Sequence, residues 1–161
     1  MKKQTNNLMT LSLARVRDIL NTDTANRPAN KSANQVLINL LNLVNNDNAK
    51  ITICGTSTGA LNRGATAECL VKMWLNNQKS AKWACNDKRA DTIHNGKAYE
   101  IKCSTSKGYA HYNPKQNLDR LIFVNQYGIY QTTGANIILD KCGKHIKDIK
   151  MNANVKTLVE W

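Results

Sequence analysis

Three charged residues flank a single predicted turn: Asp91, Glu100 and Lys102. Between them lies Asn95-Gly96, a dipeptide typical of two-residue type I′ hairpins, because both central positions of that turn need positive φ. Counting outward from the turn places Asp91 directly opposite Glu100, and Lys102 points to the same side of its strand as Glu100. Directly opposed carboxylates repel each other. We expect a divalent cation such as Mg²⁺ to relieve that repulsion.

The chemistry suited to such a cluster is metal-assisted hydrolysis. Hard cations are commonly held by one or two carboxylates together with waters and phosphate oxygens of a substrate. Lys102 adds a cationic donor beside the metal, where it can serve a phosphodiester or the water that attacks it. The pattern therefore predicts a metal and phosphate site at this hairpin.

Acidic residues are scarce in this chain, which makes their alignment informative. The 161 residues include 11 Asp and Glu against 23 Lys and Arg, and the only glutamates are Glu68, Glu100 and Glu160. The formal net charge of +12 is typical of proteins that bind polyanions, so we expect a nucleic-acid partner.

Each of these residues also has a purely structural interpretation. Glu68 fits a solvated position in the first turns of a helix, where the helix dipole favours an acid. Asp91 and Lys102 fit a cross-strand ion pair on an exposed face, which contributes only about a few tenths of a kcal/mol. His94 is expected at the end of the hairpin rather than in the site, since it projects to the face opposite Asp91.

The elements that must position these residues follow from hydrophobic periodicity and turn signals. The sequence predicts helices over residues 8–20, 33–45 and 63–75, with a polar linker over 21–31 and strands over 50–54, 88–93, 97–103, 121–124 and 129–132. Glu68 then lies on the third helix, just ahead of the hairpin that carries Asp91 and Glu100.

At this point the chain resembles a known family. Asp91 followed by Glu100-Ile101-Lys102 is similar to the bipartite signature of the PD-(D/E)XK nuclease superfamily, which has the restriction-endonuclease-like fold. The segment 63–68, which ends in Glu68, resembles the glycine-preceded glutamate on the first core helix of many members, including archaeal-type Holliday junction resolvases. The resemblance covers about residues 60–133, and the proline that commonly precedes the aspartate is replaced here by Ala90.

The resemblance implies a fold and a set of roles. It implies an α/β core over residues 50–161, with a mixed central β-sheet flanked by helices, after an N-terminal extension of two helices over residues 1–49. Asp91 and Glu100 would bind Mg²⁺, or Mn²⁺ in its place, together with the Ile101 carbonyl. Lys102 would orient or activate the attacking water. Glu68 would bind a second metal or an outer-shell water, so the four catalytic residues would be Asp91, Glu100, Lys102 and Glu68.

The expected function is that of a Mg²⁺-dependent DNA endonuclease, either restriction-like or from a phage or mobile element. The alternatives are a structure-selective nuclease of the Holliday junction resolvase type, and a nucleic-acid-binding module without catalysis. A loop of basic, aromatic and amide residues directly after the motif lysine is predicted to contact the nucleic acid through Lys107, Tyr109, His111, Tyr112, Lys115 and Gln116.

The remaining predictions concern the setting of the protein. Its beginning lacks a secretory hydrophobic region and no segment has membrane-spanning length, so we expect a cytoplasmic protein with no membrane partner. Five widely spaced cysteines without a C-x-x-C pattern are expected to be reduced. The basic residues of the N-terminal helices, among them Arg15, Arg17, Arg27 and Lys31, either bind DNA or lie in a homodimer, and the sequence leaves both open.

Overall fold

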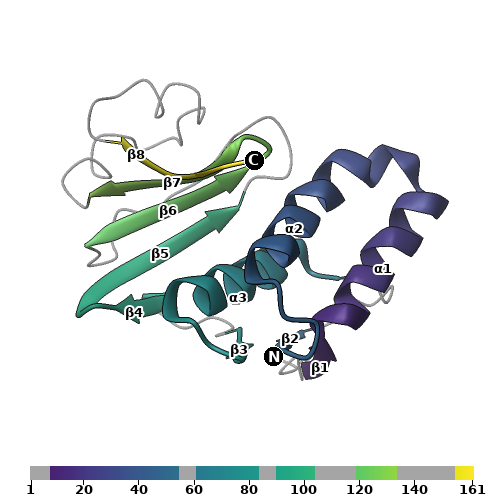
Figure 1. Cartoon of the computed structure of the whole chain (residues 1–161), viewed down its shortest axis with the longest axis horizontal. Coiled ribbons are helices and arrows are strands. Elements are labelled where there is room, and N and C mark those ends of the chain that lie inside the picture. Colours follow the sequence, from purple (N-terminus) through teal and green to yellow (C-terminus); the bar gives the residue numbers. More distant parts are fainter. Residues whose placement is uncertain (1–7, 55–60, 84–89, 104–118, 134–154) are drawn as a thin grey trace, which may run out of the picture.

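The computed structural model describes residues 8–54, 61–83, 90–103, 119–133 and 155–161 (Figure 1). In chain order the elements are β1 (Leu8–Ser12), α1 (Leu13–Asn26), the short 3₁₀ helix η1 (Pro28–Asn30), α2 (Lys31–Val44), β2 (Lys50–Cys54), α3 (Arg63–Asn76), β3 (Ser80–Lys82), β4 (Thr92–His94), β5 (Lys97–Cys103), β6 (Arg120–Asn125), β7 (Gly128–Thr133) and β8 (Val155–Glu160). The chain is a mixed α/β protein.

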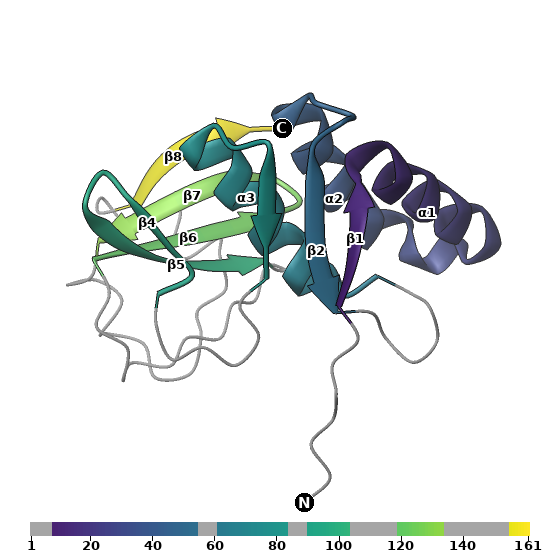
Figure 2. The ribbon, with the colours of Figure 1, turned by 90° about the horizontal axis from the view of Figure 1, so that it is seen from below.

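The described strands divide between two mixed sheets (Figure 2). The smaller sheet has the order β1-β2-β3, with β1 antiparallel and β3 parallel to β2. The larger sheet has the order β4-β5-β6-β7-β8, in which only β5 and β6 run parallel. Parallel neighbouring strands need a crossover connection, and helix α3 provides it between β2 and β3.

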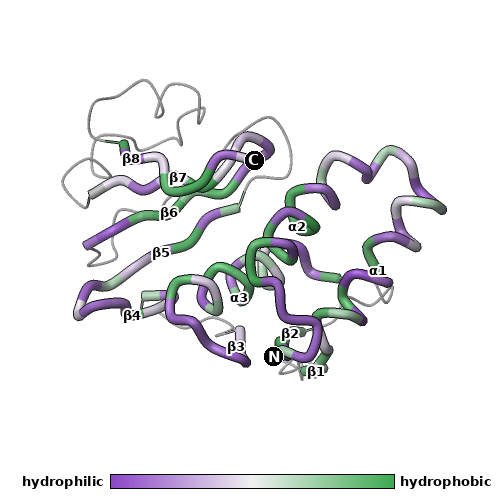
Figure 3. Tube along the Cα trace, in the orientation of Figure 1, coloured by the Kyte–Doolittle hydropathy of each residue, from purple (hydrophilic) through white to green (hydrophobic). Residues whose placement is uncertain are grey.

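Helix α3 is the central element of the fold and contacts both sheets and α2. All nine residues from Ala65 to Met73 are buried, which is typical of a helix packed on every side. Asn62 begins the helix by accepting a hydrogen bond from the Ala65 amide at 3.0 Å, and Asn77 ends it in the left-handed conformation. Apolar stretches run along α2, α3, β6 and β7 (Figure 3), and their residues form one core.

The expected helix over residues 8–20 was wrong in its first part. Leu8–Ser12 is instead a strand that pairs antiparallel with β2, and the helix begins only at Leu13, after the Ser12 hydroxyl accepts from the Arg15 amide at 3.2 Å. The predicted linker was also wrong, because α1 continues to Asn26 and η1 occupies Pro28–Asn30. Pairing with a distant strand decided the first case, and such pairing leaves little trace in a five-residue segment.

The other predicted helices and strands are present with shifted ends. The second and third helices begin at Lys31 and Arg63, and the strands over 50–54, 97–103, 121–124 and 129–132 correspond to β2, β5, β6 and β7. Of the first hairpin strand, predicted over 88–93, residues 88 and 89 lie outside the described residues and β4 begins at Thr92; β3 and β8 had not been predicted. Within the described residues, the helices are too short or too polar to cross a membrane.

Candidate active site

The hairpin β4–β5 has the predicted turn and register. Asn95 and Gly96 have φ values of 49° and 73°, and Thr92, Ile93 and His94 pair with Tyr99, Ala98 and Lys97. Positive φ at both central positions is what a type I′ turn needs. The same register carried one step further brings Asp91 to Glu100.

Asp91 lies one residue before β4, and its side chain binds the neighbouring strand. Its Oδ2 accepts a hydrogen bond from the Ile101 amide at 2.8 Å. The carboxylate therefore takes the place of a backbone partner for β5 at the point where β4 has not yet begun. This contact fixes Asp91 beside Glu100 and Ile101.

Glu100 and Lys102 lie on one side of β5, as the alternation of a strand requires. The Lys102 ammonium lies 3.1 Å from Glu100 Oε1. Glu100 is only 5% exposed, whereas the lysine side chain is 35% exposed and so reaches the solvent. The pair thus joins a buried carboxylate to an accessible cation.

Glu68 comes to the same place from α3, which packs against β5. It is 7% exposed, and its Oε2 lies 3.3 Å from the ammonium of Lys72, one helical turn further on. Lys72 is itself 8% exposed and also donates to the Lys82 carbonyl at 3.3 Å. The helix therefore brings a buried ion pair close to Asp91.

The three acids interact through Asp91. Burial, followed by the contact with Asp91 and its charge, raises the pKa of Glu68 to about 8, with Lys72 opposing the shift. Burial and the Asp91 charge likewise raise the pKa of Glu100, and here Lys102 opposes the shift. The two glutamates are thus neighbours of one aspartate on opposite elements.

Two atoms of this cluster are suited to a cation. Oε2 of Glu100 is buried and has no hydrogen-bond partner within the described residues, whereas the buried Oε2 of Glu68 has the Lys72 ammonium at 3.3 Å as its ion-pair partner. Carboxylate oxygens are the protein ligands that Mg²⁺ prefers. The donor chemistry therefore fits the predicted metal.

The cluster is not a preformed cage. Across the described ranges, no group of three or more His, Cys, Asp or Glu side chains is arranged to hold a metal ion. The reason lies in the partners of the carboxylates: Lys72 and Lys102 hold the glutamates, and the Ile101 amide holds Asp91. Binding a cation would need these carboxylates to turn toward one point.

The hairpin is also attached to α3 by polar contacts of Asn76 with two residues of β4. Asn76 donates from Nδ2 to the Thr92 hydroxyl at 3.1 Å, and its Oδ1 lies 2.9 Å from His94 Nδ1. The His94 ring also lies edge-on to Tyr99, with centroids 5.9 Å apart. His94 is a hairpin-end residue, as predicted, and the contacts with Asn76 set how the hairpin sits on the helix.

Lys72 is the site residue that the sequence reasoning missed. The signal was present, because Glu68 and Lys72 stand four residues apart, the spacing at which opposite charges meet on a helix. The predicted DNA contacts Lys107, Tyr109, His111, Tyr112, Lys115 and Gln116 lie outside the described residues. For Ile101 only the amide contact is seen, and its carbonyl as a ligand stays a prediction.

No protein-family model, curated protein or solved structure matches this chain. The fold and the site define a mixed α/β protein with a cluster of partly buried carboxylates, and its function must be inferred from these residues.

Proposed function

We propose that this protein is a Mg²⁺-dependent DNA endonuclease with a restriction-endonuclease-like core. The observation that carries the proposal is that Glu68 from α3 and Glu100 from β5 both lie beside Asp91, with both glutamates buried. Burying carboxylates costs free energy, and Oε2 of Glu100 is buried without a hydrogen-bond partner among the described residues. In a chain with only 11 acids, the free-energy cost of burying two glutamates beside an aspartate calls for a functional reason.

Burial argues against the structural interpretations of the same residues. A solvated helix position does not describe Glu68, which is buried beside Lys72 and Asp91. An exposed cross-strand pair does not describe the motif either, because Lys102 pairs with the buried Glu100 and Asp91 binds a backbone amide. Ion pairs on an exposed surface have neither a buried carboxylate nor an acid that binds a backbone amide.

Each residue has a part in the proposed reaction. Asp91 and Glu100, with the Ile101 carbonyl, would hold the cation, and Glu68 would hold a second cation or a water bound to the first. When bound, the cation stabilises charge on the phosphate oxygens and lowers the pKa of a bound water. Lys102 would orient the attacking water, whose oxygen bonds to phosphorus while the bond to the leaving oxygen breaks; the water gives up a proton to solvent, and the leaving oxygen takes one up from solvent.

Lys72 is a positioning residue in this scheme. Its ammonium holds the Glu68 carboxylate and is in turn fixed by the Lys82 carbonyl on β3. By opposing the rise in the pKa of Glu68, it favours the ionised form that a cation needs. It does not contact the substrate in this proposal.

The competing function is a nucleic-acid-binding module without catalysis. It is favoured by the lack of a preformed metal group among the described residues. Calorimetric titration with Mn²⁺ separates the two functions, because the nuclease should bind the ion through Asp91 and Glu100 and the module should not.

The decisive experiment is a cleavage assay with matched variants. Plasmid, single-stranded DNA, branched DNA and RNA are incubated with the protein in Mg²⁺ and in EDTA, which also tests junction-selective cleavage. Asp91→Asn and Glu100→Gln should each slow cleavage by about a hundredfold or more, since both remove a proposed metal ligand.

Asp119→Asn is the matched control. Asp119 also accepts a hydrogen bond from an amide of β5, that of Ala98 at 2.9 Å, but lies exposed near the turn end of the strand. Its variant should cleave at the wild-type rate. Full activity of folded Asp91→Asn protein, or cleavage in EDTA, would contradict the proposal.

A further inference from the structure

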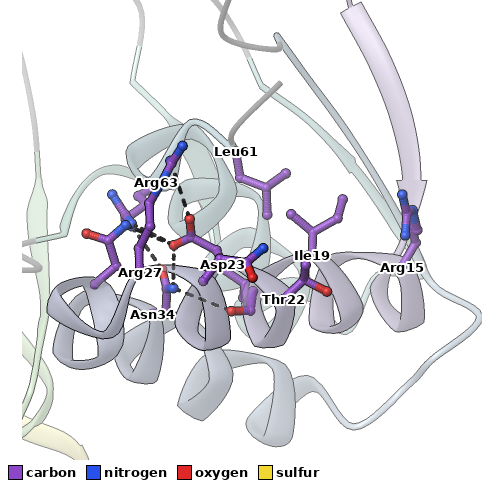
Figure 4. A pocket seen from close by; sticks show the side chains of 11 residues that line it. Arg15, Ile19, Thr22, Asp23, Arg27, Asn34, Leu61 and Arg63 are labelled. Carbon is purple, nitrogen blue, oxygen red and sulfur yellow. Dashed lines mark hydrogen bonds and ion pairs between the residues drawn. The ribbon is translucent and has the colours of Figure 1, made fainter. Parts of the chain in front are cut away.

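A pocket of about 400 Å³ lies at the N-terminal helices, bounded by α1, η1, α2 and the start of α3 (Figure 4). None of Glu68, Asp91 or Glu100 lines it. Its volume falls in the range of sites that bind ligands. The pocket contains three arginines, Arg15, Arg27 and Arg63, and one acid, Asp23.

One end of the pocket is a polar network around Asp23. Its Oδ2 accepts from Asn34 at 2.8 Å and from Asn30 at 3.0 Å. Arg63 lies 3.4 Å and Arg27 lies 3.7 Å from the same carboxylate. Two guanidinium groups therefore face one carboxylate, which leaves an excess of one positive charge here. Each guanidinium has five donors, so most remain for a ligand.

The other end is formed by Arg15 alone. Its side chain is exposed and has no hydrogen-bond or ion-pair partner within the described ranges. Arg15, Ile19, Thr22 and Asn26 follow one another at helical spacing and so share one face of α1. Figure 4 shows Arg15 at the end opposite Asp23, with Ile19 and Leu61 between them.

The distance between the two ends selects the kind of ligand. Arg15 and Arg27 are twelve residues apart, which places their Cα atoms about 18 Å apart along the helix axis. A single nucleotide carries phosphate at one side only and reaches one end. A strand carries a phosphate at every nucleotide, with sugars and bases that can lie on Ile19 and Leu61. Sites for single strands combine a positively charged groove that follows the backbone with side chains against which the bases lie; here arginines supply the positive charge and the surface between them is aliphatic.

We propose that this pocket binds a short segment of nucleic-acid strand, with phosphates at the Arg15 end and at the Arg27–Arg63 end. The proposal rests on the proposed function for the choice of a nucleic acid. It adds a substrate contact on the N-terminal helices that is separate from the carboxylate cluster. It also assigns Arg15 and Arg27 to nucleic-acid binding rather than to a dimer interface.

Binding measured without cleavage tests the inference. A fluorescein-labelled hexathymidylate is titrated with the full-length protein in EDTA, and anisotropy gives the affinity. Arg15→Gln should weaken binding about tenfold, which corresponds to about 1.4 kcal/mol. Arg17→Gln removes the same charge from the same helix, but Arg17 does not line the pocket and bonds Asn42 at 2.9 Å. The affinity of the Arg17→Gln variant for hexathymidylate should change less than about twofold.

A second pair of variants tests the pocket by shape instead of charge. Thr22→Trp fills the pocket from an exposed position of α1, whereas Asn21→Trp places the same side chain on an exposed position outside it. Only Thr22→Trp should weaken hexathymidylate binding. Thermal denaturation of all four variants checks that each is folded.

Several results would overturn the proposal. Equal losses for Arg15→Gln and Arg17→Gln would show a general charge effect, and no loss for either would exclude the pocket. Thymidine monophosphate that binds as tightly as the hexamer would replace the strand by a free nucleotide. The anisotropy experiment contains no metal, so it does not depend on cleavage. Failure of the nuclease proposal would be seen in a different experiment, as cleavage by the Asp91→Asn variant at the wild-type rate.

Discussion

Glu68 is a carboxylate that folding has removed from water, and its titration follows from that. In the unfolded chain its pKa has the ordinary value of 4.5, whereas burial and the neighbouring Asp91 raise it to about 8 in the folded protein. Between these values the folded state binds the proton more tightly than the unfolded state. The contribution of Glu68 to stability is therefore most favourable below pH 4.5 and is lost as the pH rises to about 8.

Replacing this charge should reverse the loss. We predict that Glu68→Gln, which keeps the shape of the side chain, gains stability relative to wild type as the pH rises from 5 toward 8, by about one or more kcal/mol. The difference in melting temperature, measured in EDTA at each pH, gives the effect. In a Lys72→Met variant that keeps Glu68, the loss of stability with rising pH should be larger than in wild type. This variant removes the cation that opposes the rise in the pKa of Glu68.

Mg²⁺ should act on the same carboxylate. Mg²⁺ that binds the ionised carboxylates should raise the melting temperature of the wild type near pH 8, because it binds only the folded state. A pH-independent difference between Glu68→Gln and wild type would mean that Glu68 is ionised throughout and not desolvated as described.

The hairpin β4–β5 is the element that places Asp91, and its turn depends on one backbone conformation. Gly96 has φ of 73°, with open space where a side chain would begin. An L-residue there suffers backbone strain without any collision. Gly64 is the natural comparison, since it lies in the first turn of α3 with ordinary contact to Asn62.

The two glycines should respond in opposite directions. Gly96→Ala should destabilise the protein by about 1 kcal/mol through the left-handed conformation, and it should also slow cleavage because Asp91 is held less firmly. Gly64→Ala should stabilise it by about 0.5 kcal/mol, because alanine is the better helix former. Urea denaturation measures both changes, and destabilisation of similar size in both variants would contradict this account of the turn.

The same elements explain what could be predicted from the sequence. Asn95-Gly96 is a local signal that fixes both the turn and the register, so the approach of Asp91 to Glu100 could be derived by counting. The strands β1, β3 and β8 owe their pairing to segments distant in the sequence, which no local pattern specifies.

The burial of Glu68 is a further property that the sequence could not supply. It depends on how α3 docks on β5, and that contact is tertiary. A helix surrounded by partners shows no amphipathic stripe that would mark one face as exposed. The sequence could therefore name Glu68 as a candidate but could not distinguish a solvated acid from a desolvated one.

Charge is distributed unevenly over the whole molecule. The net charge is +12, yet two of the three glutamates are buried close to Asp91. Several of the cations should neutralise phosphates on binding, so affinity for duplex DNA should fall steeply with salt, with a log–log slope of about −0.9 per contacted phosphate. Anisotropy titrations at four or more salt concentrations measure the slope. A slope near zero would exclude binding through phosphate contacts of the basic side chains.

Calcium separates the general attraction from the site. The carboxylate cluster repels the phosphate it must approach, whereas the rest of the surface attracts it, so a cation at the cluster should tighten binding beyond its effect on ionic strength. Ca²⁺ is a looser, larger ion than Mg²⁺ and should support binding with little cleavage. We predict that replacing EDTA with Ca²⁺ raises the affinity of wild type and Asp119→Asn for an uncleaved duplex but leaves Asp91→Asn unchanged. Equal tightening in all three proteins would remove Asp91 from any metal bridge to phosphate.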